Sequence, residues 1–375
     1  MPLLLLLIRS LDCGGAERQL VSLAAGLKAR GMPVRVVTFY DGGSLRDELI
    51  GCGVEYGSIK KRARWDVVMF LWRWILMVRE SRPSVLYSFL GSANLIAIAA
   101  KPWLGPVKVV WSVRASNMEL QQYGLLERVL YWIECRVSRF ADLIIVNSYA
   151  GRDYAIAHGF PPAKLIVIPN GIDVERFCPD RTARERFRKG LGVADAESLI
   201  GLVGRIDPMK GHATFLQAAA ILLRERGNVR FICVGDGPEH YRKPLLSLAK
   251  ELGLSHKVIW VNGISDVEAV YSSLDIATCS SSYGEGFSNV IGEAMACGVP
   301  CVATDVGDAQ RIIGDAGYVV VIDDPMALAE AWCKVLDMGE MARLGLGQRA
   351  RARIVQHFSL DRLIEATSSA LGITV

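Results

Sequence analysis

The sequence predicts an α/β protein with two doubly wound parallel sheets that face a central cleft. Short apolar runs alternate with longer amphipathic stretches along the whole chain, as in parallel sheets that are covered by helices on both faces. The length of 375 residues exceeds what one ordinary core holds, so two domains of similar size are expected. The alternation breaks once, at 169–173, and begins again at 199–203. The domain boundary is therefore placed between residues 172 and 173.

The first domain, residues 1–172, is predicted to hold seven strands. The apolar start at Leu3–Ile8 is expected to be a buried first strand, because it is too short to span a bilayer and lacks the basic region of a signal peptide. The stretch Glu17–Ala29 has its apolar residues on one helical face and predicts a helix. The strands are predicted at Leu3–Ile8, Val34–Phe39, Val54–Gly57, Val85–Ser88, Val107–Val113, Leu143–Val146 and Leu165–Ile168.

The second domain, residues 173–356, repeats the alternation after a polar stretch at Glu175–Arg188. The terminal segment, 357–375, holds one further amphipathic stretch, Leu360–Leu371, which is predicted to cross back to the first domain. Strands are predicted at Leu199–Val203, Val229–Val234, Lys257–Trp260, Ile276–Cys279, Val299–Ala303 and Tyr318–Val321. Helices are predicted at Ala213–Arg226, Lys243–Leu252, Val267–Leu274, Asn289–Ala296, Met326–Leu336 and Glu340–Gln356.

Composition and charge narrow the classes of partner. The nine cysteines lie scattered in apolar runs, which is typical of buried thiols in a reducing, cytoplasmic compartment. Residues 1–170 hold 21 basic against 13 acidic residues, whereas residues 171–375 hold 22 against 26. The first half is thus the better face for an anionic partner, although no nucleic acid is expected. No Asp-x-Asp occurs and the five histidines show no ligand spacing, so no metal and no other cofactor is expected.

Two acids eight residues apart, Glu285 and Glu293, are the most informative pair. The first lies in a Ser/Gly-rich turn after an apolar strand, and the second lies inside the helix that this turn opens. Amides at the start of that helix favour an anionic diphosphate, and the carboxylates can accept hydrogen bonds from sugar hydroxyls. The alternative is a solvated acid followed by an ordinary helical glutamate.

Two further turns fall at predicted strand ends, where α/β sheets bind ligands. The turn Asp12–Arg18 contains Gly14 and Gly15, which let the backbone approach a phosphate or a sugar. The turn Gly204–Gly211 places two cations beside a strand end, where they would neutralise a diphosphate. A solvated loop that carries charges is the alternative for this second turn.

Together these turns resemble the family-four retaining glycosyltransferases, also called group 1, which have the GT-B fold of two Rossmann-like domains. The resemblance implies transfer of a hexose from a UDP- or GDP-sugar to a saccharide or lipid-linked acceptor in cell-surface polysaccharide or glycolipid synthesis. The first domain would then serve the acceptor and the second would bind the nucleotide sugar. The stretches that carry the resemblance are Gly14–Glu17, Asn170–Asp173, Gly204–Gly211, Gly235–Pro238 and Glu285–Pro300.

The resemblance also implies residue roles. Arg205 and Lys210 hold the donor diphosphate, Glu285 contacts the sugar hydroxyls, and these three form the catalytic set. Glu293 binds the ribose. The remaining donor-binding positions implied are Gly14, Gly15, Gly204, Gly263, Ile264, Gly286, Phe287, Ser288, Asn289 and Val290.

The chain departs from this family after the strand Val107–Val113. Many relatives carry a histidine there, whereas this chain has Arg114 and Asn117. Both are candidates for contact with the sugar or the acceptor, and a buried structural role is the alternative for Arg114.

The stretch 60–78 is a candidate membrane contact. A basic cluster opens it and an apolar, tryptophan-rich segment too short to span a bilayer follows, which is typical of a monotopic contact on the inner face of the cell membrane. A helix packed on the sheet is the alternative.

Three alternative functions fit the sequence less well. A sugar-nucleotide 2-epimerase or hydrolase on the same fold would act without an acceptor, and the Glu285–Glu293 turn argues against it. An NAD-dependent oxidoreductase would need a glycine fingerprint that the turn at Gly14 and Gly15 does not supply. A scaffold without activity would be expected to lack the cation pair or one of the acids.

Overall fold

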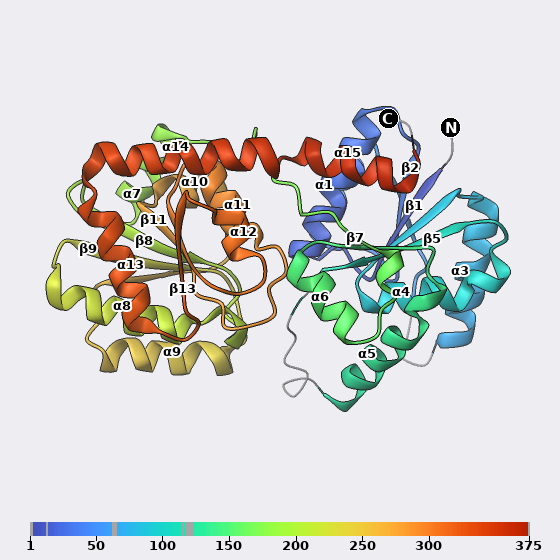
Figure 1. Ribbon diagram of the computed structural model, residues 1–375, viewed down its shortest axis with the longest axis horizontal. Coiled ribbons are helices and arrows are strands. Elements are labelled where there is room, and N and C mark those ends of the chain that lie inside the picture. The colour runs from blue at the N-terminus through green and yellow to red at the C-terminus, as the bar shows by residue number, and fades with distance from the viewer. Residues whose placement is uncertain (1–2, 13, 62–65, 115, 117–123, 374–375) are drawn as a thin grey trace. The chain divides into compact units, whose positions relative to one another are not determined.

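A computed structural model describes residues 3–12, 14–61, 66–114, 116 and 124–373. The chain divides into two compact units (Figure 1). Unit 1 comprises Met1–Gly171 together with Leu360–Val375, and unit 2 comprises Ile172–Ser359. The division after Gly171 lies one residue before the boundary expected from the sequence. The terminal helix belongs to unit 1, and the return to this unit occurs at Leu360 rather than at residue 357.

Unit 1 is built on a seven-stranded parallel sheet with the order β3-β2-β1-β4-β5-β6-β7. Every residue of the first strand is buried, because helices cover both faces of the sheet. The strands are β1 Leu4–Ile8, β2 Val34–Thr38, β3 Glu55–Ser58, β4 Val85–Phe89, β5 Lys108–Val113, β6 Leu143–Val146 and β7 Leu165–Val167.

The helices of unit 1 form one layer on each face of this sheet. Alternate residues of β1 separate the two cores: Leu4 and Leu6 pack with α1, α2 and α15, whereas Leu5 and Leu7 pack with α3, α4 and α6. The helices are α1 Gly15–Ala29, α2 Arg46–Gly51, α3 Val67–Ser81, α4 Gly91–Ala100, α5 Leu125–Val137, α6 Tyr149–Ala157 and α15 Leu360–Leu371, with short 3-10 turns η1 Lys101–Trp103, η3 Ser138–Phe140 and η4 Pro162–Lys164.

Unit 2 repeats the plan with a six-stranded parallel sheet in the order β10-β9-β8-β11-β12-β13. In both sheets the strand order reverses beside the first strand of the unit, β1 or β8, and ligands of open α/β sheets bind at the carboxyl ends of the strands near such a reversal. The strands are β8 Ser198–Val203, β9 Val229–Val234, β10 Val258–Val261, β11 Ile276–Cys279, β12 Cys301–Thr304 and β13 Gly317–Val320.

Helices also cover both faces of the second sheet. One core holds residues of α10, α11, α12 and α14, and the other holds residues of α8, α9 and α13 around the buried Trp332. The helices are α7 Arg181–Gly190, η5 Pro208–Lys210, α8 His212–Glu225, α9 Glu239–Glu251, α10 Val267–Ser273, α11 Asn289–Ala296, α12 Ala309–Ile313, α13 Pro325–Asp337 and α14 Gly339–His357.

The polar stretch after the domain boundary contains α7, which the sequence pattern did not predict. Asp180 caps this helix by accepting a hydrogen bond from the Ala183 amide at 2.9 Å. The side chains of Arg184 and Arg188 then reach Asp275. The polar pattern therefore reflects an ion-paired helix.

The stretch 60–78 forms a packed helix in part. Residues 62–65 lie outside the described residues, and α3 buries Phe70, Trp74 and Val78 against the sheet. Its opposite side exposes apolar side chains such as Val68 and Trp72. Within the described part of the chain, no helix combines the length and apolar character needed to cross a bilayer.

Candidate active site

Two of the three predicted catalytic residues, Lys210 and Glu285, are in direct contact in unit 2. Lys210 ends η5, just after β8, and Glu285 lies in the turn after β11. The Lys210 ammonium donates to Glu285 Oε1 at 2.5 Å, and the two side chains are 15% and 11% exposed. Because β8 and β11 are neighbours in a parallel sheet, their carboxyl ends bring residues 75 positions apart to one edge.

A second donor fixes the same carboxylate. The Ser281 hydroxyl donates to Glu285 Oε1 at 2.9 Å, and the Thr304 hydroxyl at the end of β12 donates to the Ser281 carbonyl at 2.5 Å. On the other side, the Ser282 hydroxyl donates to Asp323 at 2.6 Å. The turn that carries Glu285 is thus held by β12 and by the segment after β13.

Neighbouring groups favour the protonated, positively charged form of Lys210. Burial acts to lower the pKa of Lys210, but Glu285 and the Cys279 thiol outweigh it, so the pKa lies above its ordinary value. Arg205 opposes this rise, which puts its positive charge in the neighbourhood of Lys210. The Arg205 side chain is exposed and makes no hydrogen bond or ion pair within the described part of the chain.

Gly211 explains how the two loops come so close. Its φ of +63° lies in the left-handed region that favours glycine. A β-carbon at this position would collide with the Ser280 carbonyl oxygen. The Ser280 hydroxyl also donates to the Lys210 carbonyl at 3.0 Å, so the loop after β8 rests directly on the end of β11.

The other predicted loops of unit 2 lie along the same sheet edge. The loop after β9 packs closely against Gly204, as shown by the fact that a β-carbon on Gly235 would collide with the Gly204 carbonyl. The loop after β10 follows, since a β-carbon on Gly263 would collide with the Asp236 carboxylate. Ile264 adjoins Gly263 and is 36% exposed. The predicted positions Gly204, Gly263 and Ile264 therefore belong to one continuous row of loops.

The predicted diphosphate cradle is the turn that leads into α11. Phe287 is buried and meets Phe358 edge-on, with ring centroids 5.3 Å apart. The Ser288 hydroxyl lies 3.5 Å from the Cys279 sulfur at the end of β11. The Gly286 carbonyl accepts from the Asp308 amide at 3.0 Å. Asn289 and Val290 begin α11, so their amides belong to its amino-terminal turn.

The second predicted acid is also held by a buried donor. Glu293 lies in the second turn of α11, and its Oε2 accepts a hydrogen bond from the Tyr271 hydroxyl at 2.8 Å. Tyr271 lies on α10 and is fully buried. The two acids therefore have different partners: Glu285 meets an ammonium and a serine, whereas Glu293 meets a phenol.

In unit 1, the predicted glycine turn precedes the first helix. Gly14 caps α1, the first helix after β1, and Gly15 begins it; the Gly14 carbonyl accepts from the Arg18 amide. Further along this helix, Gln19 makes two hydrogen bonds with the Gly171 backbone, at 2.8 and 3.0 Å. The glycine turn and the end of the unit's last strand thus lie at the same edge of the sheet.

Arg114 is organised by three neighbours at the end of β5. Its guanidinium donates to Asn170 Oδ1 at 2.5 Å and to the Ser112 hydroxyl at 2.6 Å, and it lies 4.8 Å over the Phe89 ring. Burial lowers the pKa of Arg114, and the Tyr87 hydroxyl opposes this shift. Asn117 lies outside the described residues.

Several of these positioning residues have no signal in the sequence pattern. Ser281 is one of a run of serines, Tyr271 occupies an ordinary core position of a helix, and Asn170 lies where the alternation of apolar and amphipathic stretches breaks. Each acts through a contact between distant segments. The described residues include no group of three or more His, Cys, Asp or Glu side chains that could hold a metal ion.

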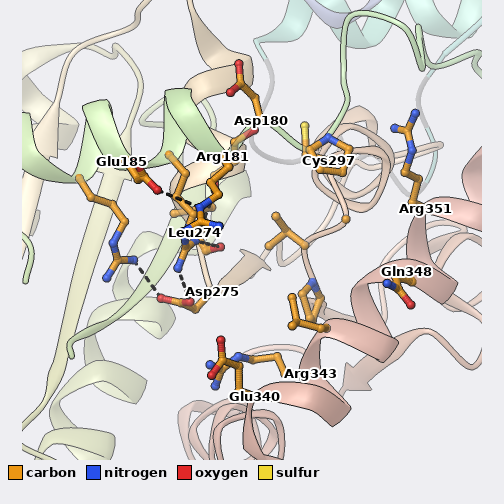
Figure 2. A pocket seen from close by; sticks show the side chains of 18 of the residues that line it. Asp180, Arg181, Glu185, Leu274, Asp275, Cys297, Glu340, Arg343, Gln348 and Arg351 are labelled. Atoms are coloured by element: carbon orange, nitrogen blue, oxygen red, sulfur yellow. Dashed lines mark hydrogen bonds and ion pairs between the residues drawn. The ribbon is translucent and has the colours of Figure 1, made fainter. Parts of the chain in front are cut away.

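A cavity of about 790 Å³ lies at the opposite edge of the unit 2 sheet (Figure 2). Its walls include Asp275 and Pro300, which precede β11 and β12. Three of the five arginines that line it are used by the fold: Arg184 and Arg188 bind Asp275, and Arg351 donates to the carbonyls of Val174, Phe177 and Ala296. This cavity shares no lining residue with the predicted site.

Two family models match the chain. Residues 13–176 match Glycosyltransferase Family 4 and residues 197–338 match Glycosyl transferases group 1. The chain therefore belongs to the family-four, group 1 glycosyltransferases, and the family predicted from the sequence is confirmed.

Curated relatives point to the same family. A D-inositol 3-phosphate glycosyltransferase of Corynebacterium urealyticum is 34% identical over 207 residues, which are 52% of this chain and 49% of that protein. A GDP-mannose-dependent alpha-(1-6)-phosphatidylinositol monomannoside mannosyltransferase of Mycolicibacterium smegmatis is 32% identical over 238 residues, 60% of this chain and 59% of that protein. The chain thus spans about half the length of these curated relatives.

Solved structures share the fold along the whole chain. Anabaena HepE in complex with UDP-glucose superposes with a TM-score of 0.88 at 23% identity, covering 99% of this chain and all of that one. WaaG, a glycosyltransferase involved in lipopolysaccharide biosynthesis, gives 0.76 at 18% identity, with 98% and 99% covered. These matches confirm the predicted GT-B fold.

Proposed function

We propose that the protein is a retaining hexosyltransferase that moves a sugar from a nucleotide-diphosphate donor to a saccharide acceptor. The observation that carries the proposal is the Lys210–Glu285 contact, at the edge of the sheet beside the exposed Arg205. Two cations at that edge suit a diphosphate, and the amides that open α11 suit its second phosphate. In support, HepE has been solved with UDP-glucose, at the fold level of similarity.

In this proposal the chain's charged groups act on the leaving diphosphate. Lys210 and Arg205 stabilise the negative charge that grows on it as the bond to the sugar breaks. Glu285 receives hydrogen bonds from sugar hydroxyls and orients the ring. The acceptor hydroxyl attacks from the face that the diphosphate leaves, and the leaving phosphate itself takes the proton. No protein nucleophile and no metal is needed, so we expect turnover to survive a metal chelator.

The proposed acceptor is a lipid-linked saccharide served by unit 1. The names of two relatives, one acting on an inositol phosphate and one on a phosphatidylinositol mannoside, support a polar acceptor that can carry a lipid. Arg114 is the proposed contact for the acceptor or for the sugar, because Asn170 and Ser112 hold its guanidinium rigidly at the end of β5.

We further propose that unit 1 reaches this acceptor on the cytoplasmic face of a membrane. Two helices expose apolar side chains: α3 exposes Val68 and Trp72, and α5 exposes Leu125 and Trp132, at 54% to 79% of their surface. Exposed arginines interrupt the apolar residues of α5, which suits an anionic bilayer surface. The predicted contact at 60–78 is thereby extended to α5.

A donor screen tests the transferase proposal. Thermal unfolding is followed with UDP-, GDP-, ADP- and dTDP-sugars, and we expect one of them to raise the unfolding midpoint, since a ligand of the folded state stabilises it by mass action. The stabilising donor is then incubated with and without saccharide acceptors. Hydrolysis or isomerisation that no acceptor accelerates would favour the alternative, a 2-epimerase or hydrolase. No shift with any donor would contradict both activities.

Vesicle sedimentation tests the membrane proposal. Phosphatidylglycerol vesicles at low salt should bind the protein, and phosphatidylcholine vesicles should not. Leu125→Glu should weaken the binding, whereas Ile156→Glu, at an exposed apolar position on α6 and so outside the two proposed contact helices, should leave it unchanged. Failure of the unmodified protein to bind the anionic vesicles would contradict the proposal.

A further inference from the structure

Glu293 is held by a residue that the transferase proposal does not use. The hydroxyl of Tyr271 donates to Glu293 Oε2 at 2.8 Å, across the contact between α10 and α11. A hydrogen bond to a carboxylate is stronger than a neutral one. It also fixes the plane of the carboxylate, because one oxygen is tied to a donor that cannot move.

Tyr271 is itself immobile. Its side chain is fully buried, and its ring meets Phe177 edge-on with centroids 6.0 Å apart. Burial raises the pKa of the Tyr271 hydroxyl well above 10, and the charge of Glu293 raises it further. The hydroxyl is therefore protonated at neutral pH and acts as a donor.

We infer that Tyr271 is a positioning residue that sets the preference of the donor site for a ribose with free hydroxyls, by aiming the Glu293 carboxylate at them. This inference rests on the proposed function, together with the ribose-binding role that the family resemblance implies for Glu293. A carboxylate that rotates freely about its last side-chain bond loses orientation each time it binds a diol. A carboxylate fixed by Tyr271 meets the 2′ and 3′ hydroxyls in one geometry.

The inference separates two roles that a simple loss of binding would confuse. If Tyr271 only supports the core, its loss weakens binding of every nucleotide alike. If it acts through Glu293, its loss weakens binding only of nucleotides that carry ribose hydroxyls. The ratio of two affinities therefore reports the positioning role, and each affinity by itself does not.

The experiment measures dissociation constants by calorimetry for UDP and 2′,3′-dideoxy-UDP, and for GDP and its dideoxy counterpart. The unmodified protein should bind one of the two ribonucleotides, and bind it more tightly than the dideoxy form. Tyr271→Phe removes only the hydroxyl, and it should lower this preference by about tenfold or more, as expected for a lost hydrogen bond to a charged group. Its affinity for the dideoxy nucleotide should equal that of the unmodified protein.

Three variants complete the design. Glu293→Gln should lose the preference, and the double variant Tyr271→Phe with Glu293→Gln should match it, because Tyr271 acts only through Glu293. Glu293→Asp keeps the charge but withdraws it from the Tyr271 hydroxyl, and should also lose the preference. Tyr318→Phe is the control: Tyr318 lies on β13 against the other core of unit 2, and its loss should leave the preference intact.

The outcomes distinguish this inference from the proposed function. If the unmodified protein discriminates but Tyr271→Phe keeps the full preference while folded, Tyr271 has no positioning role and the inference is overturned. If Glu293→Gln keeps the preference, Glu293 is not the ribose ligand and the inference is again overturned, while the diphosphate site stands. If neither UDP nor GDP binds the unmodified protein, the proposed function fails and the inference fails with it.

Discussion

Breaking the Lys210–Glu285 pair separates the stability of the site from its activity. The two side chains are mostly buried and 2.5 Å apart, so removing one partner leaves the other charge without its nearest counter-charge. Such a loss costs about 3–5 kcal/mol at a fully buried pair. Because the Ser281 hydroxyl still donates to Glu285, the lower end, about 3 kcal/mol, is expected for Lys210→Met. Glu285→Gln should cost a similar amount, since it leaves Lys210 beside Arg205.

The double variant Lys210→Met with Glu285→Gln should recover most of this stability, because neither charge then remains buried alone. For a unit of this size, about 3 kcal/mol corresponds to a fall of roughly 6–12 °C in the unfolding midpoint. Turnover should follow a different pattern. Both single variants and the double variant should lose at least about 100-fold in kcat/KM, because Lys210 acts on charge that develops in the transition state.

The assay follows thermal unfolding and release of nucleoside diphosphate from the donor that the screen identifies. Lys243→Met is the matched control, since Lys243 is 72% exposed and pairs only distantly, at 3.9 Å, with Glu239. Its midpoint and its turnover should stay at the values of the unmodified protein. Near-normal sugar transfer by Lys210→Met or by Glu285→Gln would refute the catalytic assignment. Losses of stability that simply add in the double variant would refute the coupling.

Two further predictions concern the buried side chain of His212 and the hydrogen-bonded side chain of Arg114. Burial lowers the pKa of His212 to about 4, whereas the same histidine in the unfolded chain takes up a proton near pH 6.5. Between these two values the unfolded chain binds more protons than the folded protein. The free energy of unfolding should therefore fall by up to about 3 kcal/mol as the pH drops from 6.5 to 4. Chemical unfolding at several pH values should show a smaller acid loss for His212→Asn than for the unmodified protein, and equal losses would contradict the assignment. Arg114→Lys cannot reproduce the simultaneous contacts with Asn170 and Ser112, so we expect the rate of sugar transfer to fall by more than about tenfold. Calorimetry should show unchanged binding of the nucleoside diphosphate. Weaker nucleotide binding would instead mean that Arg114 contacts the donor nucleotide.

The fold followed from the sequence because its strands are buried on both faces. Runs such as Leu3–Ile8 and Val229–Val234 are continuous and apolar, and the observed strands β1 and β9 differ from them by at most one residue at either end. The helix α7 was missed because its residues are polar on almost every side. Its burial depends on ion pairs between Arg184, Arg188 and Asp275, and no local pattern encodes partners that lie about 90 positions away.

The candidate site, like the fold, was predictable from the sequence only in part. Loops at strand ends were predictable, because parallel strands place their carboxyl ends at one edge, and Lys210 and Glu285 meet there. The residues that hold them were not predictable. Ser281 and Tyr271 are common residue types in common settings, and their roles arise only from the contacts that the packing of α10, α11 and β12 creates.

The Lys210–Glu285 contact also implies competition for one ammonium. Lys210 donates to Glu285 Oε1, so an entering diphosphate must share this donor with the carboxylate. A nucleoside diphosphate lacks the hexose that is transferred, so it makes no compensating contact with Glu285. Glu285→Gln should therefore bind UDP or GDP at least as tightly as the unmodified protein, even though its turnover is lost.

Lys210→Met should have the opposite effect and weaken the binding of the nucleoside diphosphate by about tenfold or more, because a charge-assisted contact is removed. Calorimetry with the nucleotide that binds the unmodified protein distinguishes the two. Opposite changes in nucleotide affinity for variants of the two partners of one ion pair are expected only if the lysine binds the diphosphate and the glutamate binds the sugar. A parallel loss of affinity in both variants would instead mean that the pair serves the fold of the turn, and that the diphosphate is held elsewhere.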